Sequence, residues 1–97
     1  MSIADDYIRV CIRVTGRVQG VGFRFWTMKH ARRLGLAGTV SNMADYSVEA
    51  VFYGTVVAVE EMIRLCNKGP EGACVTGLTV LSRESIAICP EEFRIQH

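Results

Sequence analysis

The segment from Tyr7 to Val14 alternates between apolar and other side chains. A period of two residues is typical of a strand that buries one face, and the apolar face here holds Ile8, Val10, Ile12 and Val14. Two further segments, Leu36 to Asn42 and Ser47 to Tyr53, are rich in β-forming residues and are separated by four residues. That connection is short enough for a hairpin, so both segments are predicted to be strands.

Two other segments have the spacing of amphipathic helices. The first follows a glycine-rich stretch and stops at Gly35, and its apolar stripe is formed by Phe23, Thr27, Ala31 and Leu34. The second follows Gly54 and ends near the Gly69-Pro70 pair. Its apolar stripe is formed by Val56, Val59, Met62, Ile63 and Cys66.

The last part of the chain contains Cys74 to Leu81, predicted as a strand, and Glu92 to Gln96, which has room for a short fifth strand. The order β-α-β-β-α-β predicts an α+β sandwich in which two helices cover one face of a mainly antiparallel sheet. We expect the other face to be exposed to water. A chain of 97 residues is long enough for one hydrophobic core, so residues 1–97 are predicted to form a single domain.

Composition and charge narrow the classes of function. Hydrophobic residues make up 49% and charged residues 22%, a balance typical of a folded chain. The formal net charge of +1 provides no broad field for nucleic acid or an anionic membrane. No apolar run approaches the about 20 residues of a membrane-spanning helix. The start, MSIADDYIRV, lacks the features of a signal peptide, so we expect a cytoplasmic protein that binds neither nucleic acid nor membranes.

The cysteines do not have the spacing of a zinc site, and the chain has only two histidines. An even number of cysteines permits disulfides, but without evidence of secretion we favour reduced, packed thiols. The four cysteines are Cys11, Cys66, Cys74 and Cys89. We expect no metal and no other cofactor.

The stretch between the first strand and the first helix has the composition of a phosphate-binding loop. Closely spaced glycines let backbone N–H groups approach a compact anion, and the start of the helix adds unpaired N–H groups and a partial positive charge. Arg24, at that helix start, can donate a forked pair of hydrogen bonds to two phosphoryl oxygens. The candidate loop residues are Gly16, Arg17, Val18, Gln19, Gly20, Val21, Gly22 and Phe23.

Two better-known glycine motifs do not fit this loop. It lacks the spacing and the Lys-Ser/Thr ending of a nucleoside-triphosphate loop. The dinucleotide fingerprint fails because the glycine expected after Gly20 and Gly22 would fall at Phe25. Taken alone, the glycines are equally consistent with a simple turn from strand to helix.

The full string points to a family. GRVQGVGFR, from Gly16 to Arg24, resembles the acylphosphatase signature G-[RK]-V-Q-G-V-x-F-R, and LGLAGTVSN, from Leu34 to Asn42, is similar to that family's L-G-L-x-G-x-V-x-N. The similarity continues through Ser47 to Val51, the Gly69-Pro70 turn and a closing Phe93-x-Ile95. This resemblance implies a ferredoxin-like βαββαβ sandwich.

The resemblance also implies an enzyme and its site. Acylphosphatases act on small molecules, the acyl phosphates, and hydrolyse them to a carboxylate and inorganic phosphate. Since inorganic phosphate is a product, we also expect it to be a competitive inhibitor. The loop and Arg24 would bind phosphate, and Asn42 would position water. By its position alone, we would favour a purely structural role for Asn42, as an asparagine that ends a strand before a turn; its occurrence with Arg24 in the family's motifs reverses that preference. We expect a monomer that needs no metal. A carboxylate with a conjugate-acid pKa near ~4 leaves without a general acid, which accounts for the absence of an obvious histidine or pair of carboxylates for acid–base catalysis.

The hairpin turn departs from the family's pattern, and the pattern does not determine the positions of two aromatic residues near the site. The family often has glycine after the acidic residue of the hairpin, whereas this chain has Asp45-Tyr46. If that position needs a positive φ, Tyr46 strains the turn by about 1 kcal/mol, or the turn changes type. Phe25 and Trp26 cannot both lie on the buried helix stripe; one could line the substrate entrance, but we favour packing at the rim of the helix.

Two other functions share parts of the pattern. An acylphosphatase-like domain begins the hydrogenase-maturation carbamoyltransferases, joined to zinc-binding and catalytic regions that this sequence lacks. RNA-binding RRM domains have the same element order, but they need aromatic side chains on the central strands. The first strand instead offers Arg9, Cys11 and Arg13, and Tyr53 alone makes a poor stacking platform. We therefore favour the enzyme.

Overall fold

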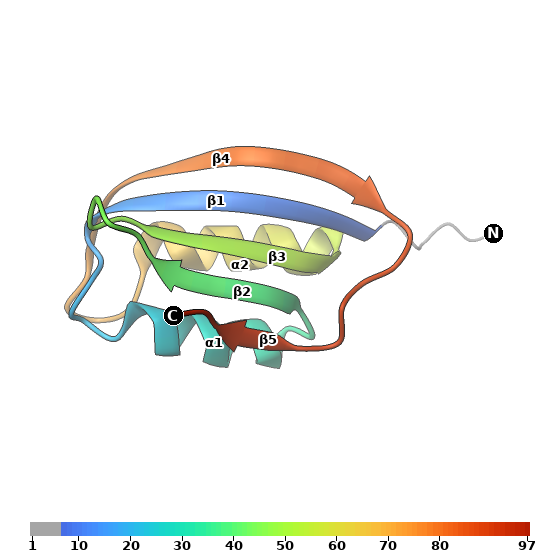
Figure 1. Cartoon of the computed structure of the whole chain (residues 1–97), viewed down its shortest axis with the longest axis horizontal. Helices are drawn as coiled ribbons and strands as arrows, with labels where there is room; N and C mark the ends of the chain where they lie inside the picture. Colours follow the sequence, from blue (N-terminus) through green and yellow to red (C-terminus); the bar gives the residue numbers. More distant parts are fainter. Residues whose placement is uncertain (1–6) are drawn as a thin grey trace.

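The computed structural model describes residues 7–97, so the prediction about a signal peptide falls largely on residues outside the described part. The chain order is β1 (Tyr7–Arg17), α1 (Phe23–Arg33), β2 (Ala37–Asn42), β3 (Val48–Thr55), α2 (Val56–Lys68), β4 (Cys74–Ile86) and β5 (Phe93–Ile95) (Figure 1). The predicted βαββαβ order and the short fifth strand are both confirmed.

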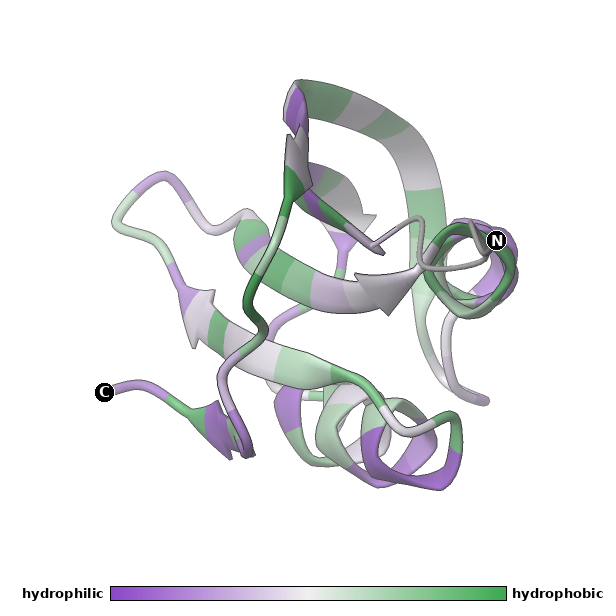
Figure 2. Cartoon of the chain, turned by 90° about the vertical axis from the view of Figure 1, so that its right-hand side faces the viewer, coloured by the Kyte–Doolittle hydropathy of each residue, from purple (hydrophilic) through white to green (hydrophobic). Residues whose placement is uncertain are grey.

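The strands form one five-stranded sheet in the order β4-β1-β3-β2-β5. All neighbours are antiparallel except β2 and β5, which run parallel. Figure 2 looks at the sheet from one end and shows both helices on the same side of it. The fold is therefore the predicted ferredoxin-like α+β sandwich with a mainly antiparallel sheet.

The core lies between the helices and the sheet face that they cover. The alternating apolar side chains of β1 are buried, as the period-two pattern predicts. Phe52 of β3 stacks on Phe93 of β5, with ring centroids 5.7 Å apart. The helices contribute Phe23, Thr27, Ala31, Val59, Met62 and Cys66 as buried residues. Leu34, predicted on the same stripe, is only half-buried because α1 ends at Arg33.

The opposite face of the sheet carries polar side chains that are partly exposed, as expected. Arg13 Nη2 lies 3.1 Å from Glu49 Oε2 across β1 and β3. Arg9 Nε donates to the Tyr53 hydroxyl at 3.2 Å. Among the helices of residues 7–97, none has the length and apolar character needed to cross a membrane.

Both β1 and β4 are longer than predicted. β1 reaches Arg17 instead of Val14, and β4 reaches Ile86 instead of Leu81. The two strands pair along their whole length, but β4 has one extra residue at each of two register shifts, opposite Cys11/Ile12 and Thr15/Gly16. These bulges interrupt the alternation on which the prediction of strand ends depends.

The cysteines are free thiols in the described structure. Cys66 is fully buried between the layers, and burial raises the pKa of its thiol to about 12. The prediction of packed thiols is wrong for Cys74, which is exposed at the start of β4. Its position at the bulged end of an edge strand leaves one side without a packing partner.

The turn between β2 and β3 adopts the strained form that the sequence raised as one alternative. Tyr46 has φ of 72°, in the left-handed region, and its side chain is 76% exposed. Asp45 Oδ1 accepts hydrogen bonds from Ser47 N at 3.0 Å and from Ser47 Oγ at 2.5 Å. These bonds lower the pKa of the Asp45 carboxyl, so their contribution to stability is present at neutral pH and is lost as the pH falls through that lowered pKa.

Replacing Tyr46 by glycine should stabilise the protein. Tyr46→Gly removes the left-handed strain but gives the unfolded chain more freedom, so we expect a net gain of about 1 kcal/mol in the free energy of unfolding. Urea denaturation measures this change. Tyr46→Ala is the matched control, because alanine keeps the Cβ atom and the strain. An equal gain in both variants would contradict the backbone explanation.

Candidate functional site

The direction of the strands brings three connections together. β1 and β2 are both antiparallel to β3, so they run in the same direction and end at the same edge of the sheet. The loop after β1 and the turn after β2 therefore lie at one end of the molecule, beside the connection between α2 and β4 (Figure 1). A side chain at Gly69, in that third connection, would approach the Phe23 ring to 2.9 Å.

A hollow of about 190 Å³ opens at this end. It lies between the loop after β1, the start of α1, the end of β2 and the C-terminal residues. Among residues 7–97, Arg24 supplies the only permanently charged side chain at the hollow, and none of the lining residues has a carboxylate side chain. The lining residues are Val18, Gly20, Gly22, Phe23, Arg24, Phe25, Asn42, Ile95 and His97.

The start of α1 is arranged to leave donors available at the hollow. Gly22 is the N-cap residue, with φ of 78°, and no side chain caps the helix there. The first turn contains no acidic residue. The N–H groups of that turn and the positive end of the helix dipole therefore favour an anion at this point.

Arg24 and Asn42 come from different elements but line the same hollow. Arg24 is the second residue of α1 and is half-buried, whereas Asn42 is the last residue of β2 and is exposed. Within residues 7–97, neither side chain takes part in a hydrogen bond or ion pair that would occupy it. Their donor groups are therefore open to a ligand.

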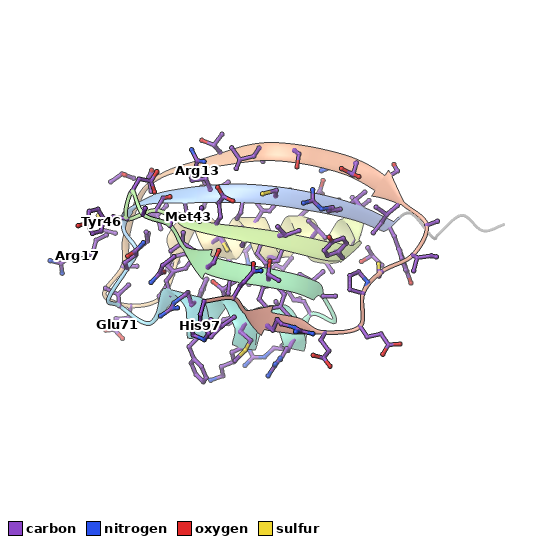
Figure 3. All side chains as sticks on the ribbon, in the orientation of Figure 1. Arg13, Arg17, Met43, Tyr46, Glu71 and His97 are labelled. Atoms are coloured by element: carbon purple, nitrogen blue, oxygen red, sulfur yellow. The ribbon has the colours of Figure 1, made fainter. Side chains whose placement is uncertain are left out.

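Some of the predicted loop residues lie elsewhere. Gly16 belongs to the end of β1, and Arg17 points away from the body of the protein (Figure 3). Val21 is half-buried and packs against the core. Gln19 donates from its side-chain amide to the backbone carbonyls of Met43 and Ser47. Of the candidate residues, the structure gathers Val18, Gly20, Gly22, Phe23, Arg24 and Asn42 around the hollow.

Three lining residues were not among the candidate site residues. Phe25 is 62% exposed and lines the hollow, so our preference for packing at the helix rim is wrong for this residue. It is right for Trp26, whose ring lies 5.4 Å from that of Phe23. Ile95 and His97 reach the hollow because β5 pairs with β2. No local sequence pattern signals that pairing.

Among residues 7–97, no three His, Cys, Asp or Glu side chains gather as the ligands of a metal ion would. What the hollow offers instead is a set of backbone and side-chain N–H donors, a guanidinium and an apolar side. Such a set suits a small anion joined to a less polar group.

Comparison with known proteins supplies the family. The family model described as acylphosphatase matches residues 10–95. The chain belongs to the acylphosphatase family. This membership confirms the prediction of an acylphosphatase enzyme.

Individual acylphosphatases agree over most of the chain. The acylphosphatase of Rhizobium etli is 44% identical over 95 residues, which cover 96% of this chain and 98% of the relative. That of Nitrobacter hamburgensis is 54% identical over 71 residues, or 73% of this chain and 71% of the relative. The crystal structure of acylphosphatase from Bacillus subtilis superposes with a TM-score of 0.87 at 31% identity, covering 93% of this chain and 99% of that one.

Two glycines of this acylphosphatase should respond differently to alanine. A Cβ atom at Gly16 would collide with the Cys74 carbonyl and lie 2.7 Å from the Thr76 backbone nitrogen, whereas one at Gly22 meets nothing within 4 Å. Gly22→Ala should therefore lose only the roughly 1 kcal/mol of left-handed strain, and Gly16→Ala should lose clearly more. Urea denaturation of both variants checks this order, and equal losses would contradict it.

Proposed function

We propose that this acylphosphatase hydrolyses the carboxyl–phosphate bond of acyl phosphates without a metal ion. In this proposal, the part of the loop that lines the hollow (Val18, Gly20, Gly22 and Phe23) binds the phosphoryl group together with Arg24, and Asn42 positions the attacking water. The observation that carries it is that Arg24 and Asn42 line one hollow at the N-terminus of α1.

The phosphoryl group would lie against the N–H groups at the start of α1, with Arg24 donating to two of its oxygens. Negative charge on these oxygens is stabilised by donors that are already in place before the reaction. Phe25 and Ile95, two apolar residues that line the hollow, would contact the acyl portion. The binding energy of both parts then orients the phosphorus atom toward Asn42.

In the chemical step, the water oxygen forms a bond to phosphorus and the bond from phosphorus to the acyl oxygen breaks. The electron pair of that bond leaves with the carboxylate, which is stable at neutral pH because its conjugate acid has a pKa near ~4. An amide cannot accept the proton of water, so Asn42 only orients the molecule. The proton passes to a phosphate oxygen or to solvent.

We further propose that residues 1–97 act as one domain and as a monomer on a small-molecule substrate, in the cytoplasm. Inorganic phosphate, the product, would compete for the same donors. Nothing in this scheme needs nucleic acid, a membrane or a cofactor.

The first test is release of phosphate from benzoyl phosphate in the presence of EDTA. We expect full activity of the wild type, and losses of about a hundredfold or more in kcat/KM for Arg24→Ala and Asn42→Ala, since each removes a donor aimed at the reacting group. Arg24→Lys is the matched variant, because it keeps the charge but loses the forked geometry. Full activity of either alanine variant removes that residue from the mechanism, and loss of wild-type activity in EDTA contradicts metal independence.

Inhibition by inorganic phosphate separates the two roles. The inhibition constant should rise at least about tenfold in Arg24→Ala, because a charged partner of the phosphate is lost. It should change little in Asn42→Ala, whose amide contacts water. Equal rises in the two variants would contradict the division of roles.

A further inference from the structure

Gln19 is the one polar side chain of the loop that is aimed into the protein and not at the hollow. It stands between the end of β1 and Gly20, is half-buried, and is absent from the lining of the hollow. Its Nε2 atom lies 3.0 Å from the Met43 carbonyl oxygen and 2.9 Å from the Ser47 carbonyl oxygen. Both hydrogens of the amide are therefore used, one on each side of the β2–β3 turn.

The two carbonyls are the ones that close this turn. Met43 N donates to Ser47 O at 2.8 Å, and Tyr46 N donates to Met43 O at 3.0 Å. Gln19 adds a second donor to each oxygen, so both acceptors are saturated. The amide thus acts as a cross-link between the loop and the last closing pair of the hairpin.

Asn42 is adjacent to this cross-link along the chain. It pairs with Val48 at the end of the β2–β3 ladder, directly before Met43 and Ser47. The loop on the other side of the cross-link continues within one residue to Gly20, which lines the hollow with Asn42. The hydrogen bonds of Gln19 consequently set the separation between the phosphate-binding loop and Asn42.

We propose that Gln19 is a positioning residue that fixes Asn42 relative to the bound phosphoryl group. This inference rests on the function proposed above, and it gives Gln19 a role different from direct substrate binding. The anion donors at the start of α1 and on Arg24 lie on the loop side of the cross-link. Loss of Gln19 should therefore leave phosphate binding nearly intact while it misplaces the water held by Asn42.

The kinetic test uses Gln19→Met, which keeps the length of the side chain and removes both donors. We expect kcat for benzoyl phosphate to fall by about tenfold or more, because small displacements of a reacting group are costly. The inhibition constant of inorganic phosphate should change by less than about threefold, a shift too small for the loss of a direct charged contact. Gln19→Asn keeps the amide but is one methylene shorter, so its kcat should lie between that of the wild type and that of Gln19→Met.

The control is Asn67→Ala. This substitution also removes a side-chain amide that donates to a backbone carbonyl, here from Asn67 in the last turn of α2 to the Ile63 carbonyl of the same helix. It should leave kcat unchanged. Combining Gln19→Met with Asn42→Ala tests the route of the effect: if Gln19 acts through Asn42, the double variant should be no slower than Asn42→Ala alone. Unchanged kcat in Gln19→Met, additive losses in the double variant, or a phosphate affinity that falls as much as kcat would each overturn the proposal.

A second measurement does not depend on turnover. Titration of the wild type with inorganic phosphate, followed by NMR, should shift the backbone amide signals of residues 43–47 together with those of the loop. In Gln19→Met the loop signals should still shift and those of residues 43–47 should not. A wild type that is inactive but shows this pattern would refute the proposed function and retain the coupling, whereas absence of the shifts at residues 43–47 in the wild type overturns the coupling itself.

Discussion

The antiparallel pairing of β3 with both of its neighbours determines where the chemistry of this protein can lie. Because β1 and β2 each oppose β3, their C-terminal ends meet at one edge of the sheet. Asn42, which ends β2, lies 18 positions after Arg24 along the chain (42 − 24), yet both residues line one hollow with the loop that follows β1. The buried apolar face of β1 belongs to the core and lies against α2, and close packing there holds the strand in place.

The backbone N–H donors at the hollow depend on the conformation of the chain between the end of β1 and the start of α1. Gly16 lets the last residues of β1 pass close to β4, and Gly22 begins the helix without a capping side chain. The helix can start in this way only if something else satisfies its first N–H groups. An anion is well suited to that task, so substrate binding and helix capping use the same groups. At the other end of α1, Arg32 donates to the Phe93 carbonyl and holds the strand that supplies Ile95 to the hollow.

Local patterns of apolar residues were sufficient to predict the order of the helices and strands. The features that they failed to predict depend on contacts between segments that are distant in the sequence. Because burial of one face gives a strand or a helix its characteristic spacing of apolar residues, β1, α1 and α2 could be predicted from the sequence. The second half of β4 was not, because most of its side chains are exposed and its two bulges break the alternation. Glycine is typical of loops, but Gly16 lies in strand β1, close to the Cys74 carbonyl of β4. Its place in the strand depends on that contact and could not be predicted from the local sequence.

The same distinction applies to the site. Arg24 and Asn42 could be proposed because they stand in two blocks that resemble one family. The partners of Gln19 lie 24 and 28 positions further along the chain, and no spacing rule connects a loop glutamine to the carbonyls of a later turn. The prediction that Phe25 packs at the rim of the helix was wrong, because the exposure of an aromatic residue on a helix depends on whether other segments of the chain cover it.

The bulges of β4 also bear on how copies of the chain behave when they meet. β4 forms one edge of the sheet, and its segment from Cys74 to Ser82 carries no charge and no proline. A straight, uncharged edge of that kind would be a template for another strand. The extra residues at Thr76 and Leu81 bend the edge and break the regular row of N–H and C=O groups. The two irregularities therefore disfavour edge-to-edge aggregation along the segment of β4 that has no charged side chains.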